Sequence, residues 1–208
     1  MSRDIVISKA LSWLLRHGAQ SEKLTIDKDG FVPLEEVLNH RRIKGTRASF
    51  EDVQRIVDNN DKKRFTLQKR DDRWFICANQ GHSIANVNGH DLKLLSTRED
   101  LPKEIIHGTY LSKIPQIIAS GGLSKMTRNH VHFASGLPKV DSDVISGMRN
   151  GCSALIYLDI DKILGQQEIK FYISKNKVIL SPGNKDGIVP TSLFLKVVKR
   201  SDNSPIAI

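Results

Sequence analysis

Cysteine is scarce in this sequence, because only Cys77 and Cys152 occur among its 208 residues. A scaffold held by disulfides needs more cysteines than this, so we expect both thiols to be reduced and buried. No apolar run reaches the roughly 18 residues of a membrane span. No apolar segment of a signal peptide follows Met1. We therefore expect an intracellular protein, in the cytoplasm, the nucleus or both, with no membrane partner.

Several motifs that bind cofactors or metals are also missing. The sequence has no glycine-rich phosphate loop followed by Lys-Ser/Thr and no Rossmann glycine fingerprint. No cysteine cluster and no His-Glu-x-x-His segment indicates zinc. No Ser/His/Asp set stands out. We expect no metal, and the candidates for chemistry are arginines and histidines spread over both halves of the chain.

Positive charge, by contrast, is abundant. Lys and Arg number 32 against 23 Asp and Glu, which gives a formal net charge of +9. Such an excess suggests a polyanionic partner, nucleic acid first, although a merely basic globular protein has the same balance. The length allows one large domain or two small ones.

The first 90 residues predict the order helix, strand, helix, helix, strand, strand. Apolar residues at helical spacing place a helix over residues 3–17, with Gly18 as its stop. Ser49 is placed to cap the third helix. This order is the layout of a winged helix, a unit often used on nucleic acid. The other predictions are a strand over 24–26, a helix from Pro33, a basic loop over 41–47 and strands over 64–68 and 74–78.

The second half is predicted to be mainly β, with a few short helices. Its β-branched and apolar runs are bounded by Gly, Pro, Asn and Asp, as is typical of strands. A helix is predicted over 112–119, with Pro115 in its first turn. Residues 84–100 read as a linker or as a strand plus a linker, and residues 201–208 read as a loose tail. The predicted strands cover residues 105–109, 130–135, 154–160, 169–174, 177–180 and 193–198.

One polar strand stands out in this half. From His130 to Ala134 polar and apolar residues alternate, so Arg128, His130 and His132 are expected to share one face. The planar fork of arginine suits phosphate oxygens. A solvated edge strand or a weak His-x-His metal site has the same pattern, so these alternatives stay open.

Six short motifs occur in one order along the chain. They are Leu14-Leu15-Arg16-His17, Asp29-Gly30-Phe31-Val32-Pro33, Arg64-Phe65, Asn79-Gln80-Gly81-His82-Ser83, His107-Gly108-Thr109 and Arg128-Asn129-His130-Val131-His132. Each motif is weak alone. In this order, over residues 5 to 199, they make the chain resemble the tRNA/RNA 2′-phosphotransferase family.

The resemblance implies an α+β protein with two lobes. Residues 1–90 would form a winged-helix RNA-binding lobe, residues 91–200 a mainly β, ADP-ribosyltransferase-like NAD⁺-binding lobe, and residues 201–208 a tail. The family removes the internal 2′-phosphate at tRNA splice junctions and consumes NAD⁺ as a co-substrate, without a metal. A 2′-phospho-ADP-ribosylated RNA intermediate leads to 2′-OH RNA, nicotinamide and ADP-ribose 1″,2″-cyclic phosphate. We expect a monomer whose partner is RNA with an internal 2′-phosphate.

The resemblance also implies roles for single residues. The catalytic set falls by motif on Arg16, His17, Arg64 and Arg128. The residues implied to bind the cofactor are His107, Gly108, Thr109, Asn129, His132 and Ser135. For His82, RNA contact and a structural hydrogen bond are equally open. The chain departs from the family pattern at Cys77, where many relatives have Arg, and at Asn150, where relatives often have His after the residue that matches Arg149.

The residue chemistry agrees with this reaction. A phosphomonoester carries nearly two negative charges near neutral pH. Three arginines can hold it through charge-assisted hydrogen bonds without a metal. Two other hypotheses stay open: an ADP-ribosyltransferase acting on terminal phosphates of nucleic acid, and a winged-helix binding module without catalysis.

Overall fold

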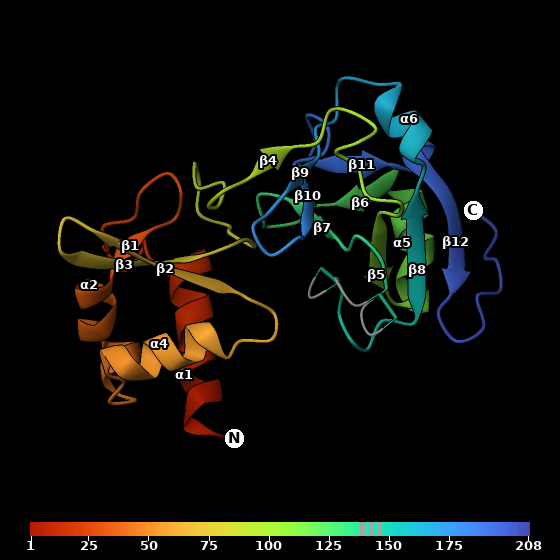
Figure 1. Ribbon diagram of the computed structural model, residues 1–208. Helices are drawn as coiled ribbons and strands as arrows, with labels where there is room; N and C mark the ends of the chain where they lie inside the picture. Colours follow the sequence, from red (N-terminus) through yellow and green to blue (C-terminus); the bar gives the residue numbers. More distant parts are fainter. Residues whose placement is uncertain (138–139, 142–143, 145–146) are drawn as a thin grey trace. The chain divides into compact units, whose positions relative to one another are not determined.

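The protein is described by a computed structural model that covers residues 1–137, 140–141, 144 and 147–208 (Figure 1). The chain divides into two compact units, Met1–Leu92 and Lys93–Ile208. Both units combine helices with antiparallel strands, in agreement with the predicted α+β class. Both cysteines are free and buried, as predicted. No helix in the described ranges is long and apolar enough to span a bilayer.

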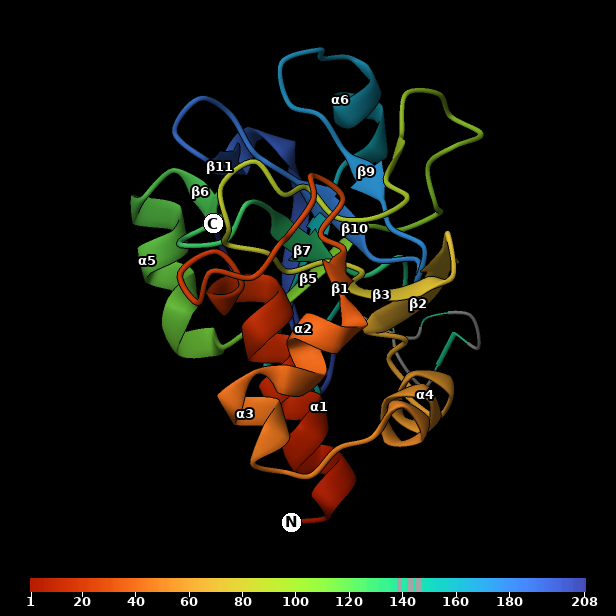
Figure 2. The same ribbon diagram turned by 90° about the vertical axis from the view of Figure 1, so that its left-hand side faces the viewer.

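The first unit packs its helices around a small sheet. Helix α1 contacts both α3 and α4, and these elements can be followed in Figure 2. Strands β1, β3 and β2 form an antiparallel sheet in that order. The elements are α1 (Arg3–Trp13), the π-helical turn η1 (Leu14–Gly18), β1 (Val32–Pro33), α2 (Leu34–Asn39), α3 (Arg41–Lys44), α4 (Phe50–Asp58), β2 (Phe65–Arg70) and β3 (Arg73–Ala78).

The first helix has the extent that the sequence predicted, but its last turn differs in type. The α-helix stops at Trp13, and the chain continues into the π-helical turn η1. Gly18 is the last residue of that turn, so the helical segment ends there. A Cβ on Gly18 would come within 2.4 Å of the Trp13 ring, so the ring packs directly on the glycine. Single π-helical turns are frequent at functional sites.

Other local predictions for this unit have mixed outcomes. Ser49 caps α4 in a capping box with Asp52, as its position predicted. The predicted strand over 24–26 is wrong, because Val32 of β1 is the residue that pairs with β3. Leu24 and Ile26 pack against the apolar core of this unit without strand pairing. The predicted basic loop contains the helical turn α3.

In the described part of the second unit, the strands form three small antiparallel sheets. Their strand orders are β4-β9-β10-β7, β11-β6 and β12-β8-β5. The elements are β4 (Lys93–Leu94), β5 (Ile106–Thr109), the 3₁₀ turn η2 (Leu111–Lys113), α5 (Ile114–Ala119), β6 (Gly122–Ser124), β7 (Val131–Phe133), β8 (Ala154–Leu158), α6 (Ile160–Leu164), β9 (Tyr172–Ile173), β10 (Ile179–Ser181), β11 (Ile188–Pro190), the 3₁₀ turn η3 (Thr191–Leu193) and β12 (Phe194–Lys199).

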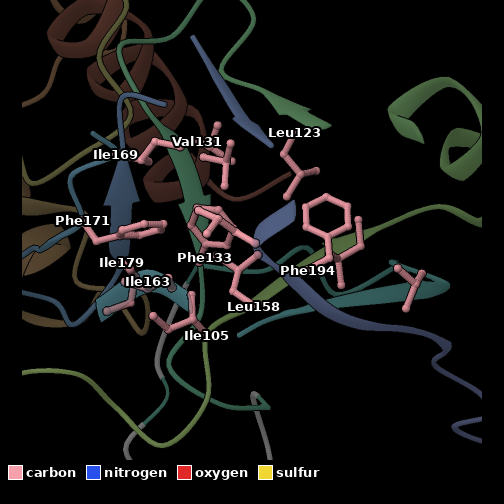
Figure 3. Close-up of a cluster of buried hydrophobic side chains, with 14 of the residues drawn as sticks. Ile105, Leu123, Val131, Phe133, Leu158, Ile163, Ile169, Phe171, Ile179 and Phe194 are labelled. Carbon is pink, nitrogen blue, oxygen red and sulfur yellow. The ribbon is translucent and has the colours of Figure 1, made fainter. Parts of the chain in front are cut away.

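The larger of two apolar clusters in this unit contains residues from all three sheets. Phe133 of β7 is fully buried and lies among the labelled side chains of Figure 3. Its ring is 6.0 Å from that of Phe171 between centroids, in a tilted arrangement. Leu158 of β8 and Ile179 of β10 belong to the same cluster. Burial of such side chains is the main force that holds the strands in place.

The polar strand is shorter than predicted. Pairing of β7 with β10 begins at Val131, opposite Ser181. Arg128, Asn129 and His130 therefore lie in the bend before β7, and the predicted shared strand face of Arg128, His130 and His132 is wrong. Antiparallel bonds between Ile106 and Ala134 then bring β5 beside the end of β7.

The end of the chain folds back on β12 and is not loose. Pro205 forms a bridge with Val198, and the main-chain nitrogen of Ile206 donates to the oxygen of Val197 at 2.8 Å. Ile206 also packs against the apolar core.

The sequence prediction also missed β6, β11 and α6, which are short elements with weak patterns.

Candidate active site

The candidate residues of the first unit begin in the π-helical turn η1. Arg16 is half-buried and His17 is exposed. Ser83 holds both of them, because its main-chain N–H donates to the oxygen of Arg16 at 2.9 Å. Its Oγ lies 2.8 Å from Nδ1 of His17. A residue 66 positions away along the chain thus fixes this turn.

The segment Asn79–Ser83, here called the 79–83 segment, lies along the same turn. Gly81 has a φ of +89°, in the left-handed region that suits glycine. A Cβ at this position would be 3.2 Å from Nε of Arg16. Glycine therefore allows both the backbone turn and the close approach of the Arg16 side chain.

Arg64 is attached to the other end of the 79–83 segment. The N–H of Asn79 donates to the oxygen of Arg64 at 2.8 Å. The Asn79 side chain, on a residue that is 2% exposed, donates to the oxygen of Lys63 at 2.5 Å and accepts from the Thr66 hydroxyl at 2.7 Å. Arg64 itself donates to Oδ1 of Asn60 at 3.3 Å. Asn79 was part of a recognised motif, but the sequence predicted no role for it.

The charge around Arg64 is positive. Burial and, to a smaller extent, the nearby Arg64 charge lower the pKa of Lys62. Burial also lowers the pKa of Arg64, and the charge of Asp61 partly offsets this. Arg64 lines a hollow of about 520 Å³ beside α1 and α4, together with the cations Lys9, Arg55 and Lys62 and the carboxylates Asp4 and Asp61. The lining therefore carries charges of both signs, with cations in excess.

His82 lies inside the first unit. The residue is 2% exposed, and its Nε2 would be 2.8 Å from a Cβ placed on Gly30. Gly30 has a φ of +88°, so the turn before β1 and the His82 ring are packed closely together. This burial supports the structural alternative for His82 over a direct contact with RNA.

In the second unit, His107 lies on β5 and is tied to β7. Its Nδ1 is 2.8 Å from the main-chain oxygen of His132. A carbonyl oxygen only accepts, so Nδ1 carries the proton and Nε2 is left as an acceptor in the neutral ring. Burial lowers the pKa of His107, which the hydrogen bond to His132 partly offsets, and the charge of Arg149 lowers it further. His107 is therefore a neutral ring with one defined tautomer at neutral pH.

The next two residues of β5 are closely packed. A Cβ on Gly108 would lie 2.4 Å from the Met148 side chain and 2.9 Å from Sγ of Cys152. Thr109 is 9% exposed and pairs with Ala154 of β8. Gly108 is therefore required for packing, whatever ligand binds beside it.

Arg128 has a second arginine near it. Partial burial and the charge of Arg149 lower the pKa of Arg128, although a guanidinium stays protonated at any working pH. The charge of Arg149 also lowers the pKa of His107, so Arg149 interacts electrostatically with both residues. The sequence left the role of Arg149 open, and no spacing rule links it to Arg128.

The remaining predicted residues surround β7. Asn129 lies in the bend before the strand, His132 within it and Ser135 just after it, and all three are half-buried. His130, between them, is 8% exposed and packs its ring edge-on to Tyr172, with 6.4 Å between centroids. Burial and the charge of Lys125 lower the pKa of His130 to about 4.

The predicted site residues thus form one group in each unit. Arg16, His17 and Arg64 are joined through the 79–83 segment, whereas Arg128 and the predicted cofactor-binding residues belong to the second unit. Within the described part of the chain, no group of three or more His, Cys, Asp or Glu side chains could hold a metal ion.

The chain matches known proteins over most of its length. A family model described as RNA 2′-phosphotransferase, Tpt1 / KptA family, matches residues 2–183. The tRNA 2′-phosphotransferase of Saccharomyces cerevisiae is 44% identical over 204 residues, which cover 96% of this chain and 86% of that protein. The human tRNA 2′-phosphotransferase 1 is 42% identical over 209 residues, covering 99% and 80%. A probable RNA 2′-phosphotransferase of Fusobacterium nucleatum is 31% identical over 182 residues, covering 87% and 94%. The chain therefore belongs to the RNA 2′-phosphotransferase, Tpt1 / KptA family.

Proposed function

We propose that this 2′-phosphotransferase removes the internal 2′-phosphate left at tRNA splice junctions and consumes NAD⁺ in doing so. The observation that carries the proposal is the attachment of Arg16, His17 and Arg64 to one short segment, with Asn79 at one end and Ser83 at the other. The segment holds Arg16 and Arg64 through their main-chain oxygens and His17 through its ring, and two arginines with an imidazole suit a phosphomonoester dianion. The winged-helix fold of the first unit and the ADP-ribosyltransferase-like fold of the second are part of this proposal.

In the first step, the RNA 2′-phosphate attacks C1″ of the nicotinamide ribose. A phosphate oxygen forms the new bond, and the bond to nicotinamide breaks. Nicotinamide leaves from a positively charged ring nitrogen, so little acid help is needed. By the family motifs, the role of Arg16, Arg64 and Arg128 is to bind and align the phosphate, which can supply much of the acceleration.

In the second step, the ribose O2″ hydroxyl attacks phosphorus and gives up its proton, and the RNA 2′-oxygen leaves and takes up a proton. The arginines stabilise the charge on the transferring phosphoryl group. His17 gives a proton or a hydrogen bond to the leaving oxygen. Its Nδ1 is engaged by Ser83, so this exchange takes place at Nε2. The products are 2′-OH RNA and ADP-ribose 1″,2″-cyclic phosphate.

NAD⁺ is proposed to bind in the second unit, where the residues fit it. His107 offers Nε2 as an acceptor for a ribose hydroxyl, because its Nδ1–H is committed to His132. The repulsion between Arg128 and Arg149 is relieved when an anionic group lies between or beside them. Thr109, Asn129 and Ser135 line the same region in this proposal.

The test is to incubate the full chain with a short RNA that carries one internal 2′-phosphate, with and without NAD⁺ and with EDTA. We expect 2′-OH RNA and nicotinamide in equal amounts, only with NAD⁺ and also in the presence of EDTA. Full activity without NAD⁺, or its abolition by EDTA, contradicts the proposal. ADP-ribose retained on RNA as the end product indicates the terminal-phosphate transferase. RNA binding without release of nicotinamide indicates a non-catalytic module.

A further inference from the structure

Ser83 binds the two adjacent residues of η1 that carry the proposed chemistry. Its main chain donates to the oxygen of Arg16 at 2.9 Å, and its hydroxyl oxygen is 2.8 Å from Nδ1 of His17. We propose that Ser83 is a positioning residue for His17, which it orients so that Nε2 is the nitrogen that meets the RNA phosphate. This inference rests on the proposed function, in which His17 acts on the phosphate.

The Ser83 hydroxyl can orient the His17 ring. His17 is exposed and lies on a π-helical turn, with its Nδ1 2.8 Å from Oγ of Ser83. An imidazole has a broad, roughly two-fold preference about its second side-chain torsion. A hydrogen bond to Nδ1 distinguishes the two ring nitrogens and selects one orientation.

The choice of a hydroxyl as the partner has a chemical consequence. A serine O–H donates to Nδ1 of a neutral ring and accepts from Nδ1–H of a protonated ring. The bond between Ser83 and His17 can therefore persist while Nε2 gains and loses a proton. A carbonyl partner, such as the one that binds His107, accepts only and holds the proton on Nδ1.

Ser83 is itself held firmly by the rest of the 79–83 segment. Asn79 is 2% exposed and bonded on both sides of its amide, to Lys63 and Thr66. Gly81 lies against the Arg16 side chain in a left-handed conformation. The hydroxyl of Ser83 is thus presented from a supported main chain, and its removal leaves the main-chain bond to Arg16 in place.

Three variants of the full chain test the inference. Ser83→Ala removes the hydroxyl, and Ser83→Thr keeps it. Ser21→Ala is the matched control, since the Ser21 hydroxyl binds the same turn through the oxygen of Gly18 at 3.0 Å but does not bond to His17 in this way. We expect Ser83→Ala to slow the second step roughly tenfold, the effect of one lost hydrogen bond, with KM for RNA nearly unchanged. Ser83→Thr should recover most of the rate, and Ser21→Ala should match wild type.

Two further readouts separate positioning from a general structural effect. In a His17→Ala background, Ser83→Ala should cause no further loss, because its effect passes through His17. The ¹⁵N resonance of His17 Nδ1 should move in Ser83→Ala and stay in place in Ser83→Thr and Ser21→Ala. An unchanged resonance, a wild-type second step in Ser83→Ala, or an equal loss in the His17→Ala background overturns the inference. Failure of wild type to remove the phosphate overturns the proposed function instead, and the resonance still decides whether Ser83 holds His17.

Discussion

His107 donates its Nδ1–H to the main-chain oxygen of His132 at 2.8 Å, which links β5 to β7 through a side chain. The acceptor is a carbonyl, so the ring has one tautomer and Nε2 is free to accept. At His17 the same ring nitrogen meets the Ser83 hydroxyl, which tolerates both protonation states. The two imidazoles are therefore suited to different tasks, a fixed acceptor at His107 and a proton-exchanging group at His17.

Replacing His107 tests its proposed part in binding NAD⁺. His107→Ala removes both the strand link and the Nε2 acceptor, so KM for NAD⁺ should rise by roughly tenfold while affinity for RNA stays the same. His107→Asn is the matched variant, because its amide N–H can keep the bond to His132 without supplying Nε2. Initial rates against NAD⁺ concentration give the comparison. If His107→Asn behaves like wild type, the role of His107 is confined to linking the strands.

Arg128→Ala should cause the largest loss of activity among the arginine variants. A phosphate that loses a bidentate partner where charge develops is expected to react on the order of a hundredfold more slowly. Arg128→Lys should recover only part of the rate, because lysine restores the charge without the planar fork. Single-turnover assays on 2′-phosphorylated RNA measure both variants, and a wild-type rate in Arg128→Ala removes this residue from the site.

His17→Ala should slow the second chemical step more than the first. The first step needs little acid help, whereas the second needs a group that gives a proton or hydrogen bond to the leaving oxygen. ADP-ribosylated RNA should therefore accumulate in this variant. A gel time course that resolves substrate RNA, the adduct and 2′-OH RNA provides the measurement. A variant that stops before any adduct forms contradicts this division.

Gly81→Ala should lower activity through the Arg16 side chain. The φ of +89° strains any other residue by about 1–2 kcal/mol. The added methyl would also lie 3.2 Å from Nε of Arg16. Gly121→Ala is the matched control, since its φ is +84° and nothing lies within 4 Å of the added Cβ. Both variants should lose similar stability in urea, but only Gly81→Ala should lose more activity than stability explains.

Stability should decrease in weakly acidic solution because of His130. Burial lowers its pKa to about 4, whereas histidine in an unfolded chain titrates near 6.5. Between these values the unfolded state binds more protons, so the free energy of unfolding is retained above pH 6.5 and falls by up to about 1.4 kcal/mol per pH unit below it. His130→Gln should reduce this dependence in urea unfolding between pH 5 and 7 and leave the part due to His107, whose pKa burial also lowers. An unchanged slope contradicts the assignment.

Some features of this protein were predictable from sequence because the interactions that form them are local. Ser49 and Asp52 make their capping box within one helical turn, so the start of α4 follows from four adjacent residues. The sequence predicted strands over residues 64–68 and 74–78 with a turn between them, and the β2–β3 hairpin is present. The order of six short motifs likewise predicted the family to which the chain belongs.

Other features depend on residues that meet only when the chain has folded. The helix predicted over residues 3–17 is present, but its last turn is π-helical and the Trp13 ring packs on Gly18. The strand at β7 begins at Val131 because Ser181, 50 positions later, is its pairing partner. The hydrophobic periodicity of the sequence could not predict either contact.

The candidate site shows the same division. Sequence motifs singled out Arg16, His17, Arg64 and Arg128, whose catalytic roles remain predictions. The bond from Ser83 to His17 and the charge of Arg149 beside Arg128 emerged from tertiary structure alone. Hydrogen bonds and charge interactions act over a few ångströms in space, whatever the separation along the chain. The sequence therefore determined which residues were candidates for the site. Tertiary packing decided which of them form hydrogen bonds or charge interactions with one another.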